Sequence, residues 1–138
     1  MDTKVLIVAV VENENGDVLL RKKPEGSPPY EQTWYIFGAE LMAGEDIEKT
    51  LVAHVQKQAG ITVAFRQRVG WDTEIKNDLD GVRKHFVYLD VICDYVSGEI
   101  TWGEGIETIE WVPRSKLAEY DNVPPSVELF KQLGYINP

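Results

Sequence analysis

The stretch that decides the fold runs from Trp34 to Ile61 and reads WYIFGAELMAGEDIEKTLVAHVQKQAGI. Its second half predicts one amphipathic helix, from about residue 46 to residue 58. Ile47, Leu51 and Val55 recur every four residues, which places them on one face of that helix. We therefore expect all three side chains to be buried.

Both ends of this helix carry sequence signals. Asp46 suits the N-cap, because its carboxylate can accept hydrogen bonds from the free N–H groups of the first turn. Gly60 suits the left-handed residue that ends a helix, and Ile61 can then pack back on Val55. The Gly-rich loop and the helix should form one stiff unit that holds polar side chains in fixed positions.

This stretch resembles the signature box of the Nudix hydrolases, G-x5-E-x7-R-E-U-x-E-E-x-G-U, in which U is an aliphatic residue. Gly38-Ala39 falls at the Gly pair of the family, Glu45 at the first Glu, Val55 at the aliphatic position and Gly60-Ile61 at the terminal pair. The spacing from Glu45 to Gly60 fits without a gap. The resemblance implies the fold of that family.

Four positions of the box carry different chemistry. Ala53 replaces the Arg, and His54, Lys57 and Gln58 replace glutamates that bind magnesium or manganese in the family. A lysine ammonium repels a metal ion, and Gln58 offers one neutral oxygen where magnesium prefers carboxylates. A softer metal could use His54, but a single His is more often structural. The alternative to a binding role is that all three side chains lie on a solvated face of the helix.

Several acids near the box are candidates for chemistry. Glu45 matches the family, and Glu104 and Glu107 lie where many members place an extra metal-binding or base Glu, so the resemblance implies catalytic roles for them. It places metal near Gly38, Glu40 and Gln58, and Glu40, Glu45 and Glu104 are the set that could share one magnesium ion. The alternative is that these are surface acids, with Glu45 stabilised by the helix dipole.

A ligand would need cations and aromatic side chains. Arg21 and Lys23 end a strand close to the box and could contact phosphates, although short basic runs are as often solvated. Trp34 could stack on a base, although such side chains are more often half-buried packing. Lys57, with His54 beside it, could meet a phosphate directly, without a metal between them.

Composition limits the function classes. The chain has 138 residues, which suits a single domain, residues 1–138, with a real core. It carries 14 Lys and Arg against 23 Asp and Glu, a net charge of -9 that argues against binding nucleic acid or an anionic membrane. The single Cys93 cannot form an internal disulfide, and the N-terminus has no signal-peptide pattern, so we expect a cytoplasmic protein.

Apolar runs and turn signals predict the remaining elements. Asn15-Gly16 is typical of a tight hairpin turn, and Pro113 should end the last strand. Strands mixed with two or three helices indicate a mixed β-sheet sandwiched between helices. The expected strands are 4–11, 18–21, 34–37, 61–74, 82–95 and 107–112, and the expected later helices are 115–120 and 126–133.

Three functions remain open. The first is hydrolysis of a nucleoside diphosphate linked to another group, with magnesium or manganese as cofactor, as the resemblance implies. The second is a non-catalytic module that binds or senses a nucleotide or phosphate ligand without a cofactor. The third is a structural partner protein. A small-molecule ligand is expected in the first two, a homodimer stays open, and a fold alone does not decide among them.

Overall fold

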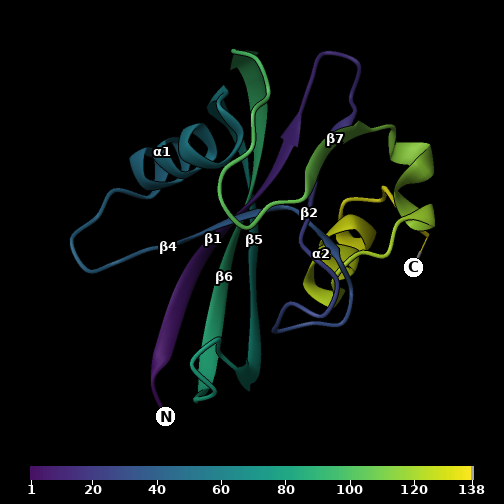
Figure 1. Ribbon diagram of the computed structural model, residues 1–138. Helices are drawn as coiled ribbons and strands as arrows, with labels where there is room; N and C mark the ends of the chain where they lie inside the picture. The colour runs from purple at the N-terminus through teal and green to yellow at the C-terminus, as the bar shows by residue number, and fades with distance from the viewer. Residues whose placement is uncertain (138) are drawn as a thin grey trace.

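The computed structural model describes residues 1–137. Within them the chain forms a seven-stranded sheet, with one long helix on one side and two shorter helices on the other (Figure 1). This confirms the predicted mixed sheet sandwiched between helices. The elements are β1 (Thr3–Glu12), β2 (Val18–Lys22), β3 (Trp34–Tyr35), β4 (Phe37–Glu40), α1 (Ile47–Ala59), β5 (Thr62–Asn77), β6 (Arg83–Ser97), β7 (Thr108–Val112), the 3-10 helix η1 (Arg114–Glu119) and α2 (Pro124–Gln132).

Strand β1 lies at the centre of the sheet. It pairs in parallel with β6 and antiparallel with both β2 and β4. Strand β5 pairs with β6 and forms one edge, and β7 pairs with β2 on the other side. A strand that is paired on both sides and covered on both faces consists mostly of aliphatic residues. This explains the nearly continuous aliphatic sequence of residues 4–11.

Two apolar cores lie on opposite faces of this sheet. The core under α1 contains Leu51, Val55 and Phe37. From β1 it includes the odd-numbered residues Ile7, Ala9 and Val11. The core under η1 and α2 contains Phe130 with even-numbered residues such as Val10. Successive strand residues point to opposite faces, so one strand contributes to both cores.

The ends of α1 are built as the sequence predicts. Asp46 accepts a hydrogen bond from the backbone N–H of Lys49 at 2.8 Å. Gly60 has φ 73°, in the left-handed region, and its N–H bonds the carbonyl of Gln56. A Cβ at Gly60 would lie 2.5 Å from Thr101 Oγ1, so the close approach of the segment after β6 also favours a glycine there.

Two predictions about this region are wrong. Ile47 is 39% exposed, whereas Leu51 and Val55 are fully buried. Ile47 is the first residue of α1 and follows an exposed loop, so a large part of its side chain stays in water. The expected strand 34–37 is divided into β3 and β4, because the first half pairs with β2 and the second with β1.

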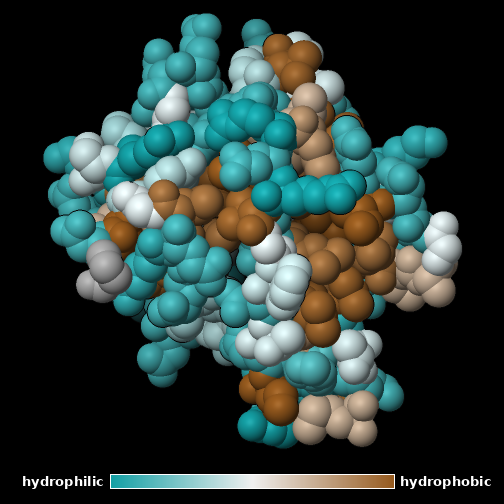
Figure 2. Space-filling view, turned by 180° about the vertical axis from the view of Figure 1, so that it is seen from behind, coloured by the Kyte–Doolittle hydropathy of each residue, from teal (hydrophilic) through white to brown (hydrophobic). Residues whose placement is uncertain are grey.

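Apolar surface is also exposed outside the cores. Figure 2 shows hydrophobic side chains near the middle of the view from behind, bordered by polar ones. Trp71 and Ile75 of the edge strand β5 are among the exposed apolar residues, at 78% and 50%. No helix within residues 1–137 has the length and apolar character needed to cross a bilayer.

Candidate functional site

A cavity of about 360 Å³ lies on the α2 side of the sheet. Its walls include five aromatic rings, from Tyr30, Tyr35, Phe37, Phe86 and Tyr88. Its charged lining is mainly cationic, although the whole protein has a net charge of -9. Aromatic walls with a few convergent charged groups are typical of small-molecule sites. The charged lining residues are Lys4, Arg21, Lys23, Lys76 and Asp78.

Arg21 is the most unusual of these residues. It is 7% exposed, and its guanidinium carbon lies 4.2 Å from the centre of the Tyr35 ring and 4.8 Å from that of Phe37. Its Nε donates to the carbonyl of Ile36 at 3.3 Å, and no carboxylate among the described residues pairs with it. Burial lowers the pKa of Arg21 to about 10, so it remains charged at neutral pH. Its other N–H donors are available to an anion.

His54 of α1 lies close enough to Arg21 and to Lys57 to feel both charges, although neither helix residue lines the cavity. The His54 ring packs against Phe37 with a centroid distance of 6.5 Å, and its buried Nε2 has no partner within residues 1–137. Burial, followed by the charges of Arg21 and Lys57, lowers the pKa of His54 to about 4. His54 is therefore neutral at physiological pH, and the region where the family places glutamates is positively charged.

The segment between β6 and β7 carries two further candidates, Glu104 and Glu107. The N–H of Gly103 donates to the carbonyl of Gln58 at 3.0 Å, so the exposed Glu104 follows close to this helix end. The N–H of Glu107 donates to the carbonyl of Lys22, and its carboxylate lies 3.9 Å from the Lys22 ammonium. Glu104 therefore lies near the end of α1, whereas Glu107 lies beside the end of β2.

The remaining acids have local partners. The Glu45 carboxylate accepts from the N–H of Met42 at 2.8 Å, within its own loop. Glu40 lies 3.6 Å from the ammonium of Lys4. Gly38 lies opposite Val8 in the sheet and lines the main cavity.

A magnesium site does not fit these residues. In the part of the chain that the structure describes, no three His, Cys, Asp or Glu side chains come close enough to hold a metal ion. Glu40, Glu45 and Glu104 therefore do not form the shared group that the sequence analysis expected. At the helix, a lysine and a neutral imidazole occupy positions where the family has carboxylates.

Two predicted ligand contacts have structural partners instead. The Lys23 ammonium donates to the carbonyls of Ser27 and Tyr30, at 2.7 and 2.9 Å, and so ties down the loop after β2. Burial lowers the pKa of Lys23. Trp34 is half-buried and lies edge-on to Tyr120 at 4.9 Å, beside the core under α2. Ligand contact by either residue stays a prediction.

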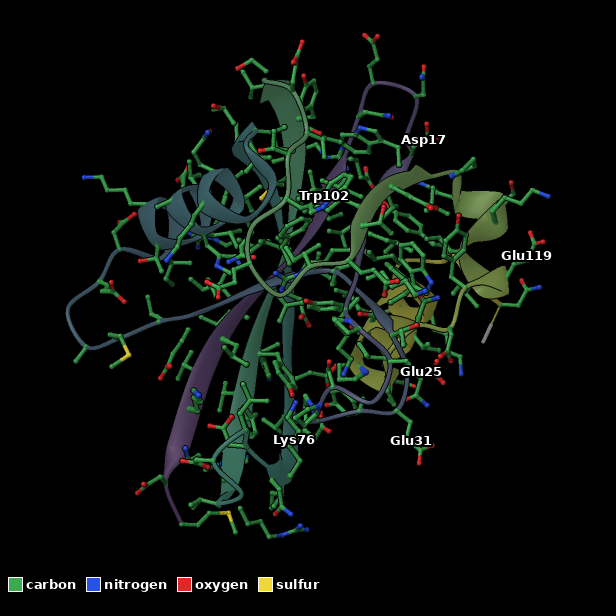
Figure 3. All side chains as sticks on the ribbon, in the orientation of Figure 1. Asp17, Glu25, Glu31, Lys76, Trp102 and Glu119 are labelled. Atoms are coloured by element: carbon green, nitrogen blue, oxygen red, sulfur yellow. The ribbon has the colours of Figure 1, made fainter. Side chains whose placement is uncertain are left out.

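Lys76 is a cavity residue that the sequence analysis missed. Figure 3 places it near the end of β5, in the same part of the molecule as the loop that carries Glu25 and Glu31. Its ammonium donates to the Tyr30 hydroxyl at 2.8 Å and lies over the rings of Tyr30 and Phe86. Lys76 lies in a strand far along the chain from the box, so only the alternation of β5 could have suggested it.

Comparison with known proteins agrees with this architecture. The chain is 23% identical, over 99% of its length and all of the relative's, to the nucleoside triphosphatase NudI of Enterobacter sp. (strain 638). A NUDIX hydrolase from Nitrosomonas europaea has a TM-score of 0.76 at 15% identity, covering 96% of this chain and 89% of that one. The MutT protein of Methanosarcina mazei Go1 has a TM-score of 0.71 at 18% identity, covering 97% and 93%.

One similar structure contains a ligand. The NUDIX domain of Shewanella oneidensis NrtR, solved with ADP ribose, has a TM-score of 0.72 at 12% identity and covers 97% of this chain and 88% of that one. At these identities the structural likeness shows the fold alone. The NUDIX domain family model matches residues 2–133, and on that match the chain belongs to the NUDIX family.

Proposed function

We propose that this protein binds a nucleotide or a related phosphate ligand through Arg21 and Lys57, with little or no metal-dependent hydrolysis. The adjacent aromatic cavity would hold the rest of the ligand. The observation that carries the proposal is the buried guanidinium of Arg21, which lines the cavity and has no acidic partner among the described residues.

The energetics of Arg21 support an anionic ligand. Removing a charged group from water is costly, and a buried cation is normally paired with a carboxylate. Ring faces stabilise it only partly. A phosphate would supply the missing charge and would accept two parallel N–H bonds from the guanidinium. Lys57 is exposed on the neighbouring helix and can add a second cation.

This site has no strong base to activate a water molecule at the positions where the family has glutamates. A hydrolase needs a positioned base, and the family places metal-bound carboxylates at the positions of His54, Lys57 and Gln58. The imidazole of His54 is neutral but, with a pKa of about 4, it is a weak base at neutral pH. We therefore expect binding to exceed turnover.

Hydrolysis of a nucleoside diphosphate linked to another group remains the second candidate. It is supported by the family match and by the relative named as a nucleoside triphosphatase. Glu104, which follows the contact with the end of α1, and Glu107, beside Lys22 of β2, are the acids that could serve it as a general base.

Calorimetry with ADP and ADP-ribose in excess chelator tests the binding proposal. The native protein should bind, and Lys57→Glu should weaken binding about tenfold or more, because one attractive charge becomes repulsive. Lys49→Glu, the same charge change at the exposed start of α1, is the control and should leave affinity unchanged. Equal binding by native protein and Lys57→Glu would remove Lys57 from the site.

Product release from the same compounds with added magnesium or manganese separates the two candidates. We expect turnover well below the ordinary enzyme range of roughly 1–1000 per second. Chelator-sensitive turnover within that range would establish the hydrolase and overturn the binding module. Glu104→Gln and Glu107→Gln would then identify the acid responsible.

A further inference from the structure

Asp90 of β6 is a buried acid that the proposed site does not use. It is 4% exposed, and its Oδ2 has no hydrogen-bond partner within residues 1–137. Most buried polar atoms in proteins have a partner, so each exception requires a reason. An unpartnered carboxyl destabilises the fold, whereas an apolar residue at this sheet position would not.

A second cavity, of about 230 Å³, lies against Asp90. Its charged lining residues within the described chain are all acids, in contrast to the cationic main cavity. The two cavities share Val8, Tyr88 and Pro125 and are therefore neighbours. The acids of this second cavity are Asp72, Glu74, Asp90 and Glu128.

The two acids that β5 contributes to this cavity accept hydrogen bonds from other side chains. Glu74 accepts from the hydroxyls of Tyr30 and Tyr88, and Asp72 accepts from Gln132 at 3.1 Å. Gly70, the β5 neighbour of Asp90, leaves open space, since a Cβ there would meet nothing within 4 Å. Asp90 is thus the buried acid of this cavity, and its buried Oδ2 has no partner within residues 1–137.

We propose that Asp90 is a specificity-determining residue that accepts a hydrogen bond from the amino group of a heterocyclic ring in the ligand. The proposal rests on the proposed function for the position of the phosphate, at the cationic end of the adjoining cavity. The aromatic walls between the two ends suit a flat ring. The ligand class is a nucleotide with an amino-substituted base, and a base without that group should bind less well.

The state of the carboxyl is consistent with this role. Burial, with the charge of Asp72 adding to it, raises the pKa of Asp90 to about 7. Near neutral pH the group can therefore also present an O–H beside its acceptor oxygen. An amino group next to a ring nitrogen, as in adenine or cytosine, complements that pair of atoms.

Pairs of ligands that differ only in the amino group test this role, with all binding measured in excess chelator. Adenosine and purine riboside differ in the amino group, and their diphosphates add the phosphate end. Calorimetry should show the native protein preferring the amino member of each pair by about tenfold, the size expected for one buried hydrogen bond. Asp90→Leu should lose this preference and bind both members like purine riboside, whereas Asp90→Asn, whose amide also places an acceptor oxygen beside a donor, should retain it. Asp94→Leu, the same change on the same strand outside the cavity, should keep it.

Carboxyl carbon NMR of aspartate-labelled protein gives an independent readout, because adenosine should shift the Asp90 resonance. Equal binding of both nucleosides by the native protein, or a preference retained in Asp90→Leu, would overturn the proposal. A response to 1,4-diaminobutane and to neither nucleoside would also overturn it, because it would assign the site to an alkylamine. If adenosine is preferred but its diphosphate binds no more tightly, the subsite stands and the phosphate site fails.

Discussion

Three buried charged residues show three different ways of placing a charge in this fold. Glu12 is 1% exposed and accepts from Arg66, from Arg114 at 3.0 Å and from Tyr135. Arg21 has aromatic faces and one carbonyl, and the Oδ2 of Asp90 has no partner in the described chain. Only Glu12 is explained by the stability of the fold. The other two are the residues that we assign to a ligand.

The stability of the protein should report the titration of Asp90. The pKa of Asp90 in the folded state, about 7, lies above its ordinary value of 3.8, so near neutral pH the folded state binds a proton that the unfolded state releases. Below about pH 4 the carboxyl is protonated in both states and does not lower the free energy of unfolding. As the pH rises towards 7 it lowers the free energy of unfolding progressively, by about 4 kcal/mol at most. Urea unfolding of the native protein and Asp90→Leu across this range measures it. A difference between the two that does not change with pH would contradict the prediction.

At the scale of an element, the positions along α1 differ in how much they contribute to the stability of the fold. Leu51 and Val55 are fully buried against the sheet, whereas Ile47 at the first position is half-exposed. The caps at Asp46 and Gly60 fix where the helix starts and stops. The helix therefore presents His54 and Lys57 from a frame that is held at both ends and along one side.

Truncation along this helix should be strongly position-dependent. Leu51→Ala should lower the free energy of unfolding by roughly 2–5 kcal/mol, because it leaves a cavity in the core under α1. Ile47→Ala, the matched control four residues earlier, should cost less than about 1 kcal/mol because that side chain is partly in water. Urea denaturation measures both. Equal losses would show that the first turn is packed like the second.

At the scale of the whole molecule, a strongly acidic protein contains neighbouring cavities of opposite charge on one face of its sheet. Long-range attraction of an anion is therefore weak, and selection depends on short-range contacts inside the cavities. The hydrogen bonds of Glu12 connect β1 to elements that are far apart in the sequence. Arg66 belongs to β5, Arg114 belongs to η1, and Tyr135 follows α2.

Breaking that network should destabilise the whole domain. Glu12→Ala leaves two arginines and a tyrosine without their shared acceptor, so it should lower the free energy of unfolding by about 3–5 kcal/mol. Glu14→Ala, two residues away and exposed, should change it by less than about 0.5 kcal/mol. Chemical denaturation distinguishes them, and a Glu12→Ala variant as stable as native would show that the network contributes nothing.

The sequence by itself determined the local features of this protein. The start and end of α1, the hairpin turn at Asn15-Gly16 and most strand positions depend on residues that are close along the chain. Caps and turns require particular residue types at single positions, and periodicity is a property of one segment. The spacing of the box is local in the same way, and it led to the family.

The tertiary structure alone decided which side chains meet. Arg21, His54 and Lys57 come from two elements, and Lys76 reaches the cavity from an edge strand. The burial of Asp90 and the exposure of Ile47 likewise follow from which neighbours cover them. Strand pairing and packing between residues far apart in the chain set these relations, and no pattern within one segment records them, because burial and charge pairing are properties of the assembled fold.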